Sequence, residues 1–371
     1  MKLLQLLLIV GLGLAVAAWF VFVPRQPAPS GPRAVGQIEF TLKDSRGQSL
    51  PVTIWYPAAA SAPNAPLEAP TPAPVILYSP GWAGTRTQSS IQVENLASHG
   101  FVVVACDDLS TNTSFDLASD AAMATTIERA GRDVVGQAGR LLEVLRALAT
   151  GQPALLDGRL DLTRVGVLGY SMGGAAGLAA ALQDPRIAAV MSLDGGLFGP
   201  PATEIGSAAY FLLSSSEAFP TEAELASPVP FIRNYALISA IDIPRNKLRM
   251  ERPGNYWAQI PKADHGDLSD ALFVFSRAKL FRTSFERRAM NSAIEAYQVA
   301  FFRSVLLGDS APLLALVGRS DQTVRWISST STPAVSPRAA AASSAARSRS
   351  IPRNHRAEVT GPCRAPSRPP P

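Results

Sequence analysis

A serine framed by glycines is the feature of this sequence that most strongly indicates chemistry. Residues 165–174 read VGVLGYSMGG, and Ser171 stands at the centre of a G-x-S-x-G pattern. The apolar residues before it predict a strand, and the alanine-rich residues after it predict a helix. A serine at such a tight strand-to-helix turn exposes its hydroxyl, and the flanking glycines let strand and helix approach closely. Ser171 is therefore predicted to be a nucleophile rather than part of a structural turn.

A serine hydroxyl is a weak nucleophile near neutral pH, so a base must take its proton. Of the three histidines, His99 closes a predicted helix and His355 lies in a polar C-terminal segment. His265 instead follows the last predicted strand of the central region and is surrounded by glycine and polar residues. This position fits the chain order serine, acid, histidine that G-x-S-x-G enzymes use, so His265 is the predicted base.

The third catalytic group must be a carboxylate that orients the imidazole and stabilises its protonated form. Asp194 ends the apolar run 188–193, whereas Glu217 comes one predicted strand later. Asp194 is preferred because its strand is apolar enough to be central, which brings the acid out beside the nucleophile. Glu217 stays the alternative, and either acid could simply cap a helix or form a surface ion pair.

Acyl transfer also requires backbone N–H groups aimed at the developing oxyanion. One normally comes from the residue after the nucleophile and one from the loop after the third strand. Met172 and Trp82, the latter in the segment YSPGWAG of residues 78–84, are predicted to supply them. This glycine-rich loop lacks the Lys-Ser/Thr pair of a phosphate-binding P-loop, which argues against a nucleotide site.

The elements that must position these residues alternate between short apolar runs and helical segments. Such alternation predicts an α/β protein with a mostly parallel central sheet and helices on both faces. The first two strands are predicted to form an antiparallel hairpin, and residues 195–252 are a candidate cap or pocket wall. Strands are predicted at residues 37–42, 51–56, 74–78, 101–106, 165–169, 188–193, 209–213 and 256–260, and helices at 87–98, 122–149, 172–183 and 290–307.

The order and spacing of these segments resemble the plasma-type platelet-activating factor acetylhydrolase family and its bacterial relatives, which overlap with the predicted dienelactone hydrolases. The resemblance spans residues 37–307 and implies the α/β-hydrolase fold. It also implies Ser171, Asp194 and His265 as the catalytic triad. The segments that carry it are residues 74–84, 96–101, 169–174, 192–194 and 264–265. The chain departs from the family at Pro80, where histidine is common, and its serine nucleophile argues against the cysteine-dependent dienelactone activity.

Composition and charge exclude several other classes of function. Hydrophobic residues make up 47% of the 371 residues and charged residues 17%, which allows a large buried core. The net charge is +5, but residues 319–371 hold 9 Arg and 2 acids, so residues 1–318 carry +5 − 7 = −2. The folded part is therefore not basic, and no nucleic acid is expected as a partner. Two cysteines and three histidines without ligand spacing predict no disulfide framework and no metal, and the predicted triad chemistry implies no cofactor.

The two ends differ from the central region. Residues 3–23 form an apolar run broken only by Gln5, and about 20 such residues suffice to cross a bilayer. A signal-anchor is favoured over a cleaved signal peptide, because the run continues beyond the small residues at 15–17. Residues 24–36 are predicted to be a proline-rich linker. Residues 319–371, rich in Ser, Ala, Pro and Arg, are predicted to be a disordered basic tail that is either dispensable or contacts anionic lipid.

These expectations combine into a serine carboxylic-ester hydrolase that is membrane-anchored or exported to the periplasmic or extracellular face. Its catalytic domain is predicted to span residues 37–318 and to act through an acyl-enzyme on a small-molecule or lipid-like ester, with short-chain or acetyl esters preferred. A lipase or polyester hydrolase of the same fold, and a non-catalytic binding module, are the alternatives. The oligomeric state is left open. Candidate pocket walls are the aromatic residues Trp82, Tyr170, Phe198 and Trp257, which could equally be ordinary core.

Overall fold

The computed structural model describes residues 5, 10–13, 19, 21–44, 46–68, 72–111, 114–274, 279 and 282–329. Within them nine strands form one sheet in the order β1-β2-β4-β3-β5-β6-β7-β8-β9. The strands are β1 (Ala34–Lys43), β2 (Ser49–Ala58), β3 (Ala73–Ser79), β4 (Val102–Cys106), β5 (Leu160–Tyr170), β6 (Ile187–Leu193), β7 (Ala209–Ser214), β8 (Tyr256–Gln259) and β9 (Arg325–Ser329). The helices are α2 (Ser90–Ser98), α3 (Asp120–Ala149), α4 (Met172–Ala181), α5 (Glu222–Leu225), α6 (Pro230–Met250), α7 (Ser284–Phe302) and α8 (Ala311–Leu316).

The centre of the sheet is parallel. Strands β4, β3, β5, β6, β7 and β8 pair in parallel in that order, whereas β1, β2 and β9 add antiparallel pairs at the two edges. Every residue of β3, β4 and β7 is buried, as expected for strands that are covered on both faces. The mostly parallel sheet and the antiparallel first hairpin are therefore as predicted.

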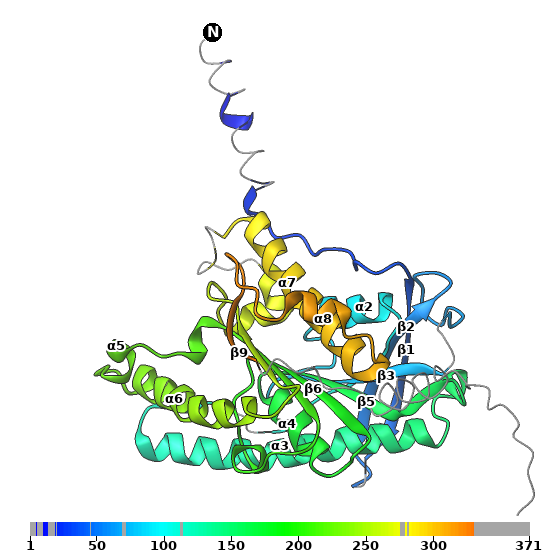
Figure 1. The fold of residues 1–371 in the computed structure, drawn as a ribbon, viewed down its shortest axis with the longest axis horizontal. Helices are drawn as coiled ribbons and strands as arrows, with labels where there is room; N and C mark the ends of the chain where they lie inside the picture. The colour runs from blue at the N-terminus through cyan, green and yellow to red at the C-terminus, as the bar shows by residue number, and fades with distance from the viewer. Residues whose placement is uncertain are drawn as a thin grey trace, which may run out of the picture. The chain divides into compact units, whose positions relative to one another are not determined.

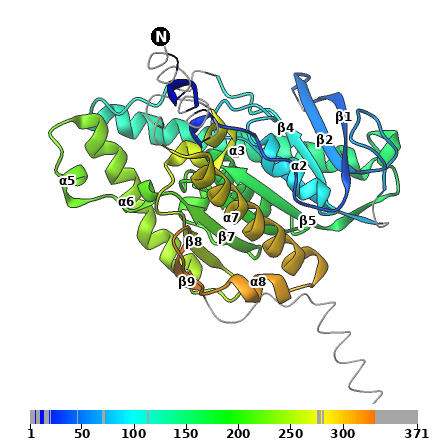
Figure 2. The ribbon, with the colours of Figure 1, turned by 90° about the horizontal axis from the view of Figure 1, so that it is seen from above.

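Helices cover both faces of this sheet. Successive strand side chains point to opposite faces, so Val165 and Val167 of β5 join one buried cluster while Leu168 and Tyr170 join the other. The first cluster includes residues of α3 and α4, and the second includes residues of α2 and α7. Figure 1 shows α7 and α8 on one side of the sheet and α3 on the other. In Figures 1 and 2, α5 and α6 lie at the opposite end of the sheet from β1 and β2.

Helix α6 was not among the predicted helices. It lies inside the segment 195–252 that was predicted only as a cap or pocket wall. Pro230 stands in its first turn, where the missing N–H costs nothing, but Pro244 lies in its interior. An internal proline and the absence of a clear apolar stripe hide this helix from an analysis of periodicity.

The C-terminal boundary of the predicted catalytic domain, residue 318, is wrong, because the sheet continues to β9. Strand β9 pairs antiparallel with β8. The ring of Trp326 lies 5.8 Å from that of Phe211, 6.2 Å from that of Tyr256 and 5.7 Å from that of Tyr297. These aromatic contacts bury part of a short segment of the predicted tail, and such burial opposes the entropy cost of ordering it.

Much of the chain's two ends lies outside the described residues. This holds for most of the predicted signal-anchor at residues 3–23 and for residues 330–371 of the predicted tail. No helix in the described part of the chain is both long enough and apolar enough to cross a bilayer. The predicted linker, residues 24–36, runs into β1, and Ser30 donates its backbone N–H to Asn95 Oδ1 of α2 at 2.8 Å.

Candidate active site

The predicted catalytic residues all follow parallel strands of the sheet. Ser171 comes directly after β5, Asp194 directly after β6, and His265 a few residues after β8. Parallel strands present their carboxyl ends at the same edge, where α/β proteins commonly bind ligands. Residues that are far apart in the sequence therefore meet at this edge.

Ser171 lies at a strained turn between β5 and α4. Its φ of 52° and ψ of −128° lie in a region that non-glycine residues seldom adopt. The turn is closed so tightly that a Cβ built on Gly169 would lie 2.3 Å from the carbonyl oxygen of Gly173. A Cβ on Gly173 would lie 2.1 Å from the carbonyl oxygen of Ser79 in β3. Only glycine fits at either position, which explains the G-x-S-x-G pattern in physical terms.

Two more residues with a left-handed φ belong to loops at the same edge of the sheet as the nucleophile. Besides Asn64 and Ser171, the non-glycine residues in this conformation in the described part of the chain are Ala83 and Asp194, each with a φ of 53°. Such conformations cost about 1–3 kcal/mol each and persist where the surrounding structure enforces them, often at functional sites. The concentration of strain near Ser171 marks this edge of the sheet as a candidate active site.

A continuous hydrogen-bond chain joins the three predicted triad residues. His265 Nε2 lies 2.9 Å from Ser171 Oγ, and His265 Nδ1 lies 2.7 Å from Asp194 Oδ2. Both separations are within hydrogen-bond range, and the imidazole stands between the hydroxyl and the carboxylate. This is the arrangement in which a histidine can take the serine proton while the carboxylate holds its tautomer.

Asp194 is itself held by a residue that the sequence analysis did not identify. Ser215, directly after β7, donates its backbone N–H to Asp194 Oδ1 and its hydroxyl to Oδ2, both at 2.7 Å. These bonds satisfy a carboxylate that is only 7% exposed. The serine run at residues 214–216 was the only sequence signal for this role, and serine runs are too common to identify it.

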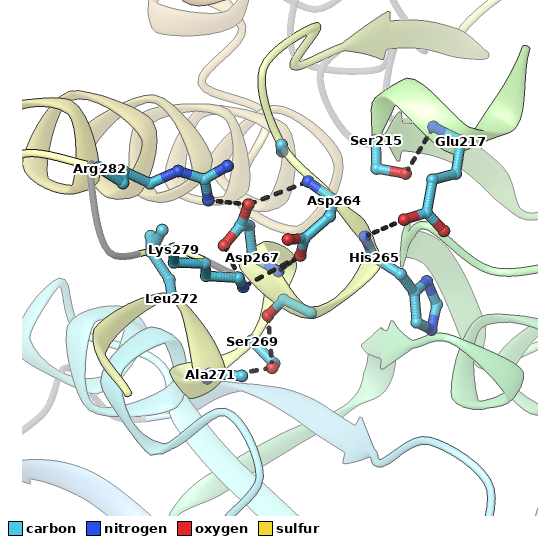
Figure 3. Close-up of polar contacts among 12 residues, drawn as sticks. Ser215, Glu217, Asp264, His265, Asp267, Ser269, Ala271, Leu272, Lys279 and Arg282 are labelled. Atoms are coloured by element: carbon cyan, nitrogen blue, oxygen red, sulfur yellow. Dashed lines mark hydrogen bonds and ion pairs between the residues drawn. The ribbon is translucent and has the colours of Figure 1, made fainter. Parts of the chain in front are cut away.

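Glu217, the alternative acid, reaches a different part of His265. Its Oε1 accepts from the backbone N–H of His265 at 3.4 Å, and its Oε2 accepts from the Tyr235 hydroxyl at 2.6 Å. Figure 3 shows this carboxylate beside the backbone of His265 rather than beside the imidazole. Of the two acids considered, Asp194 therefore contacts the ring and Glu217 contacts the main chain.

The charges around His265 favour its protonated form. Burial opposes a charged imidazolium, but the hydrogen bond to Asp194 and the negative charges of Asp194, Glu217 and Asp264 outweigh this effect. Together they raise the pKa of His265 above its ordinary value. The histidine is thus well suited to hold the proton that it receives from a nucleophile.

The loop that carries His265 is fixed by a buried ion-pair cluster. Asp264 and Asp267 form a reciprocal capping box at the start of the short helical turn η4 (His265–Leu268). Asp267, fully buried, is paired with Lys279 Nζ at 2.6 Å and with the Arg282 guanidinium (Figure 3). Burial disfavours ionisation of Asp267, yet these hydrogen bonds and charges hold its pKa below the usual range. The cluster gives the base a rigid support.

The two predicted oxyanion donors, Trp82 and Met172, belong to segments next to Ser171. Met172 opens α4, and the first N–H groups of a helix have no partner within it. In the facing loop Gly81 and Ala83 donate their N–H groups to side-chain acceptors, whereas no hydrogen bond among the described residues uses the N–H of Trp82 or Met172. A Cβ built on Gly81 would lie 3.3 Å from Ser171 Cβ, so this loop packs against the nucleophile.

A cavity of about 440 Å³ adjoins the triad. Ser171, Asp194 and His265 line it, together with the four aromatic residues predicted as pocket walls, Trp82, Tyr170, Phe198 and Trp257. Helix α6 supplies a wall that the sequence analysis did not foresee in detail: Tyr235, Ile238, Ser239, Asp242, Ile243 and Asn246. The volume of this cavity is typical of sites that bind small organic molecules.

Within the described ranges, no group of three or more His, Cys, Asp or Glu residues is arranged so that it could hold a metal ion. The expectation that the protein uses no metal and no cofactor stays a prediction. The described residues bring a hydroxyl, an imidazole and a carboxylate together at the site.

Comparison with known proteins adds independent information. The family model described as PETase, PET hydrolase-like, matches residues 27–195. Cutinase est2 of Thermobifida alba is 31% identical over 141 residues, which are 38% of this chain and 37% of that protein. Cutinase 1 of Thermobifida cellulosilytica is 27% identical over 166 residues, 45% of this chain and 52% of that protein. The chain thus matches these curated relatives over only about a third to a half of their length.

A solved structure extends the likeness to most of the chain. The ferulic acid esterase from Streptomyces cinnamoneus superposes with a TM-score of 0.59 at 21% identity, and the match covers 81% of this chain and 98% of that one. At this level of sequence identity, the structural similarity shows a shared fold alone. The chain therefore has the α/β-hydrolase fold and is similar, over residues 27–195, to PET hydrolase-like proteins and cutinases.

Proposed function

We propose that this protein is a serine carboxylic-ester hydrolase that works through an acyl-enzyme. The observation that carries the proposal is the hydrogen-bond chain from Ser171 Oγ through His265 to Asp194 beside a small-molecule-sized cavity. The similarity to cutinases and to PET hydrolase-like proteins supports the same class of reaction.

In the first half-reaction Ser171 Oγ attacks the ester carbonyl carbon while His265 Nε2 takes the hydroxyl proton. The negative charge that develops on the carbonyl oxygen is received by the N–H groups of Trp82 and Met172. When the tetrahedral intermediate collapses, the ester C–O bond breaks and His265 gives its proton to the leaving alcohol. The acyl group is then bound to the serine.

In the second half-reaction a water molecule takes the place of the alcohol. His265 removes a proton from this water, whose oxygen attacks the acyl carbon, and the proton returns to Ser171 as the acid is released. Asp194 stabilises the imidazolium that forms twice in each cycle. One ester and one water are thereby converted into one acid and one alcohol.

Short-chain or acetyl esters of modest size are the proposed substrates. A cavity of about 440 Å³ can enclose a small acyl or alcohol group, and the aromatic wall of Trp82, Phe198 and Trp257 provides apolar contact area. The resemblance to platelet-activating factor acetylhydrolases, noted from the sequence, stays a prediction.

A polyester hydrolase is the second candidate, and the PET hydrolase-like match favours it specifically. The two candidate functions differ in the substrate that must reach Ser171. A small-ester hydrolase binds a dissolved molecule, whereas a polyester hydrolase binds a segment of a solid polymer. Measuring soluble acid released from polyester particles, beside the rates on p-nitrophenyl esters of increasing acyl length, separates them.

The proposal is tested by reaction with a fluorophosphonate probe, because only an activated hydroxyl attacks phosphorus rapidly. Labelling is expected at Ser171, and Ser171→Ala should abolish both labelling and ester hydrolysis while circular dichroism stays unchanged. The control is Ser49→Ala, which removes an exposed hydroxyl of β2 that does not line the cavity. A folded wild-type protein that resists the probe contradicts the proposal and leaves the non-catalytic binding module.

The proposed location is a membrane-tethered or exported one, on the periplasmic or extracellular face. The apolar run at residues 3–23 supports it. Fractionation of cells that express the full chain, against a chain starting at residue 33, should show whether this run holds the enzyme at a membrane.

A further inference from the structure

Helix α6 presents three polar side chains to the cavity. Ser239, Asp242 and Asn246 all line it, and their spacing of three and four residues places them along one face of the helix. The neighbouring wall is apolar, with Phe198, Leu212, Ile243 and Trp257 among its residues. Polar groups at isolated places in an apolar wall are the usual means by which a pocket fixes the orientation of its ligand.

Asn246 is the most unusual of the three. The residue is only 4% exposed, and its Oδ1 is buried without a hydrogen-bond partner among the described residues. Buried polar atoms in proteins are almost always paired, so an unpaired one at a cavity wall requires an explanation. Because the oxygen and nitrogen ends of an amide can exchange places, a ligand group at the cavity wall can pair with Asn246.

Asp242 adds a second acceptor four residues before Asn246. Its Oδ2 accepts from the backbone N–H of Leu197 at 2.7 Å, and its Oδ1 is paired with Arg245 Nη1 at 3.1 Å. A carboxylate has about four acceptor positions, so two bonds leave it able to accept more. A Cβ built on Gly196, two residues after Asp194, would lie 3.4 Å from Asp242 Oδ2, so this acceptor is close to the catalytic edge.

The charges nearby decide which donor fits. Arg245 is paired with Asp242, and the charge of the buried Arg249 also acts on this carboxylate. Two guanidinium groups disfavour a cationic ligand such as an ammonium. A neutral hydroxyl is compatible with them, and it also suits Asn246 in either orientation of its amide, because a hydroxyl both donates and accepts.

We propose that Asp242 and Asn246 form a specificity subsite that binds a hydroxyl group carried by the ester substrate, several bonds from the carbonyl that Ser171 attacks. The inference rests on the proposed ester hydrolysis and narrows its substrates to hydroxylated acyl or alcohol groups. Tyr235, on the same helix, hydrogen-bonds to Glu217 beside His265. Asp242 lies seven residues further along the same helix, about 10 Å from Tyr235.

The test compares matched esters with and without a terminal hydroxyl. On the acyl side these are the p-nitrophenyl esters of 6-hydroxyhexanoate and 8-hydroxyoctanoate against hexanoate and octanoate. On the alcohol side they are hexanediol monoacetate and hexyl acetate. The full-length protein is expected to prefer the hydroxylated member of at least one pair by about three- to tenfold in kcat/KM, the effect of one neutral hydrogen bond.

The variant Asn246→Leu replaces the amide with an apolar group of similar size. It should reduce the hydroxyl preference to about one, and its Tm should be equal to or above that of the wild type, since a buried unpaired polar atom is removed. A purely structural asparagine would instead lower Tm and leave the preference intact. Asp242→Asn, which can still accept from Leu197, should reduce the preference independently. Ile241→Leu, on the exposed face of α6, is the control that should keep it.

These experiments can refute the proposed subsite and the proposed enzymatic function separately. Hydrolysis of the plain esters without any hydroxyl preference, or a preference that survives both Asn246→Leu and Asp242→Asn, overturns the subsite alone. A folded protein that cleaves none of these esters overturns the proposed function itself.

Discussion

Replacing Asp194 with asparagine tests the proposed triad most directly, because the surrounding hydrogen bonds dictate how the new amide must lie. Asp194 Oδ1 accepts from the backbone N–H of Ser215, which can only donate. The amide oxygen of asparagine must therefore face Ser215, and its NH₂ group must face the Ser215 hydroxyl and His265 Nδ1. Nδ1 is then forced to accept, the ring proton moves to Nε2, and the imidazole can no longer take a proton from Ser171.

The expected loss follows from this geometry. With the wrong tautomer fixed, kcat should fall by about 10⁴-fold, the scale seen for the equivalent change in a serine protease, or about 5.5 kcal/mol of transition-state stabilisation. The amide can escape by turning over, but its NH₂ would then oppose the Ser215 N–H. Leaving that buried donor unpaired costs about 1–3 kcal/mol, so even the escape costs at least about fivefold.

The assay is kcat and KM on a p-nitrophenyl ester for wild type, Asp194→Asn and Glu217→Gln, with circular dichroism and Tm as controls for folding. Asp194→Asn should lose activity in kcat with little change in KM, whereas Glu217→Gln should keep most of it. A folded Asp194→Asn that retains more than about a fifth of wild-type kcat refutes the reasoning. A nearly active Asp194→Asn beside an inactive Glu217→Gln would transfer the role of the acid to Glu217.

Three other measurements address the electrostatics and the domain boundary. The charge of Glu217 helps to raise the pKa of His265, so Glu217→Gln should move the acid limb of the kcat/KM profile to lower pH, and an unmoved limb contradicts this. Burial raises the pKa of Glu295 to about 7, so the folded state binds its proton more tightly than the unfolded chain. Stability should be lost as pH rises from about 4.5 to 7, by up to about 3 kcal/mol, and Glu295→Gln should raise Tm more at pH 8 than at pH 5. Deleting residues 324–371 removes strand β9 with its tryptophan and should lower Tm by several degrees relative to a chain that ends at 329; equal melting would show that β9 contributes little.

Local patterns allowed much of the fold to be predicted. Eight of the strands lie where apolar, β-branched runs predicted them, since burial on both faces of a parallel sheet requires continuous apolar sequence. The capping box of Thr283 and Glu286 starts α7 at Ser284, earlier than the apolar periodicity indicated. Strand β9 escaped prediction because its support comes from rings on other elements, which composition does not reveal.

The sequence by itself determined the candidate nucleophile and its base. The G-x-S-x-G turn is local, since only glycine permits the close approach around Ser171, and the scarcity of histidine leaves His265 as the one that follows a strand. The tertiary structure decided which side chains from separate strands and helices point toward one another. It brought Asp194 rather than Glu217 to the imidazole, placed Ser215 behind that acid, and brought Asn246 of α6 to the cavity wall. These relations join residues that are distant along the chain, so only packing of the whole sheet and its helices brings them together.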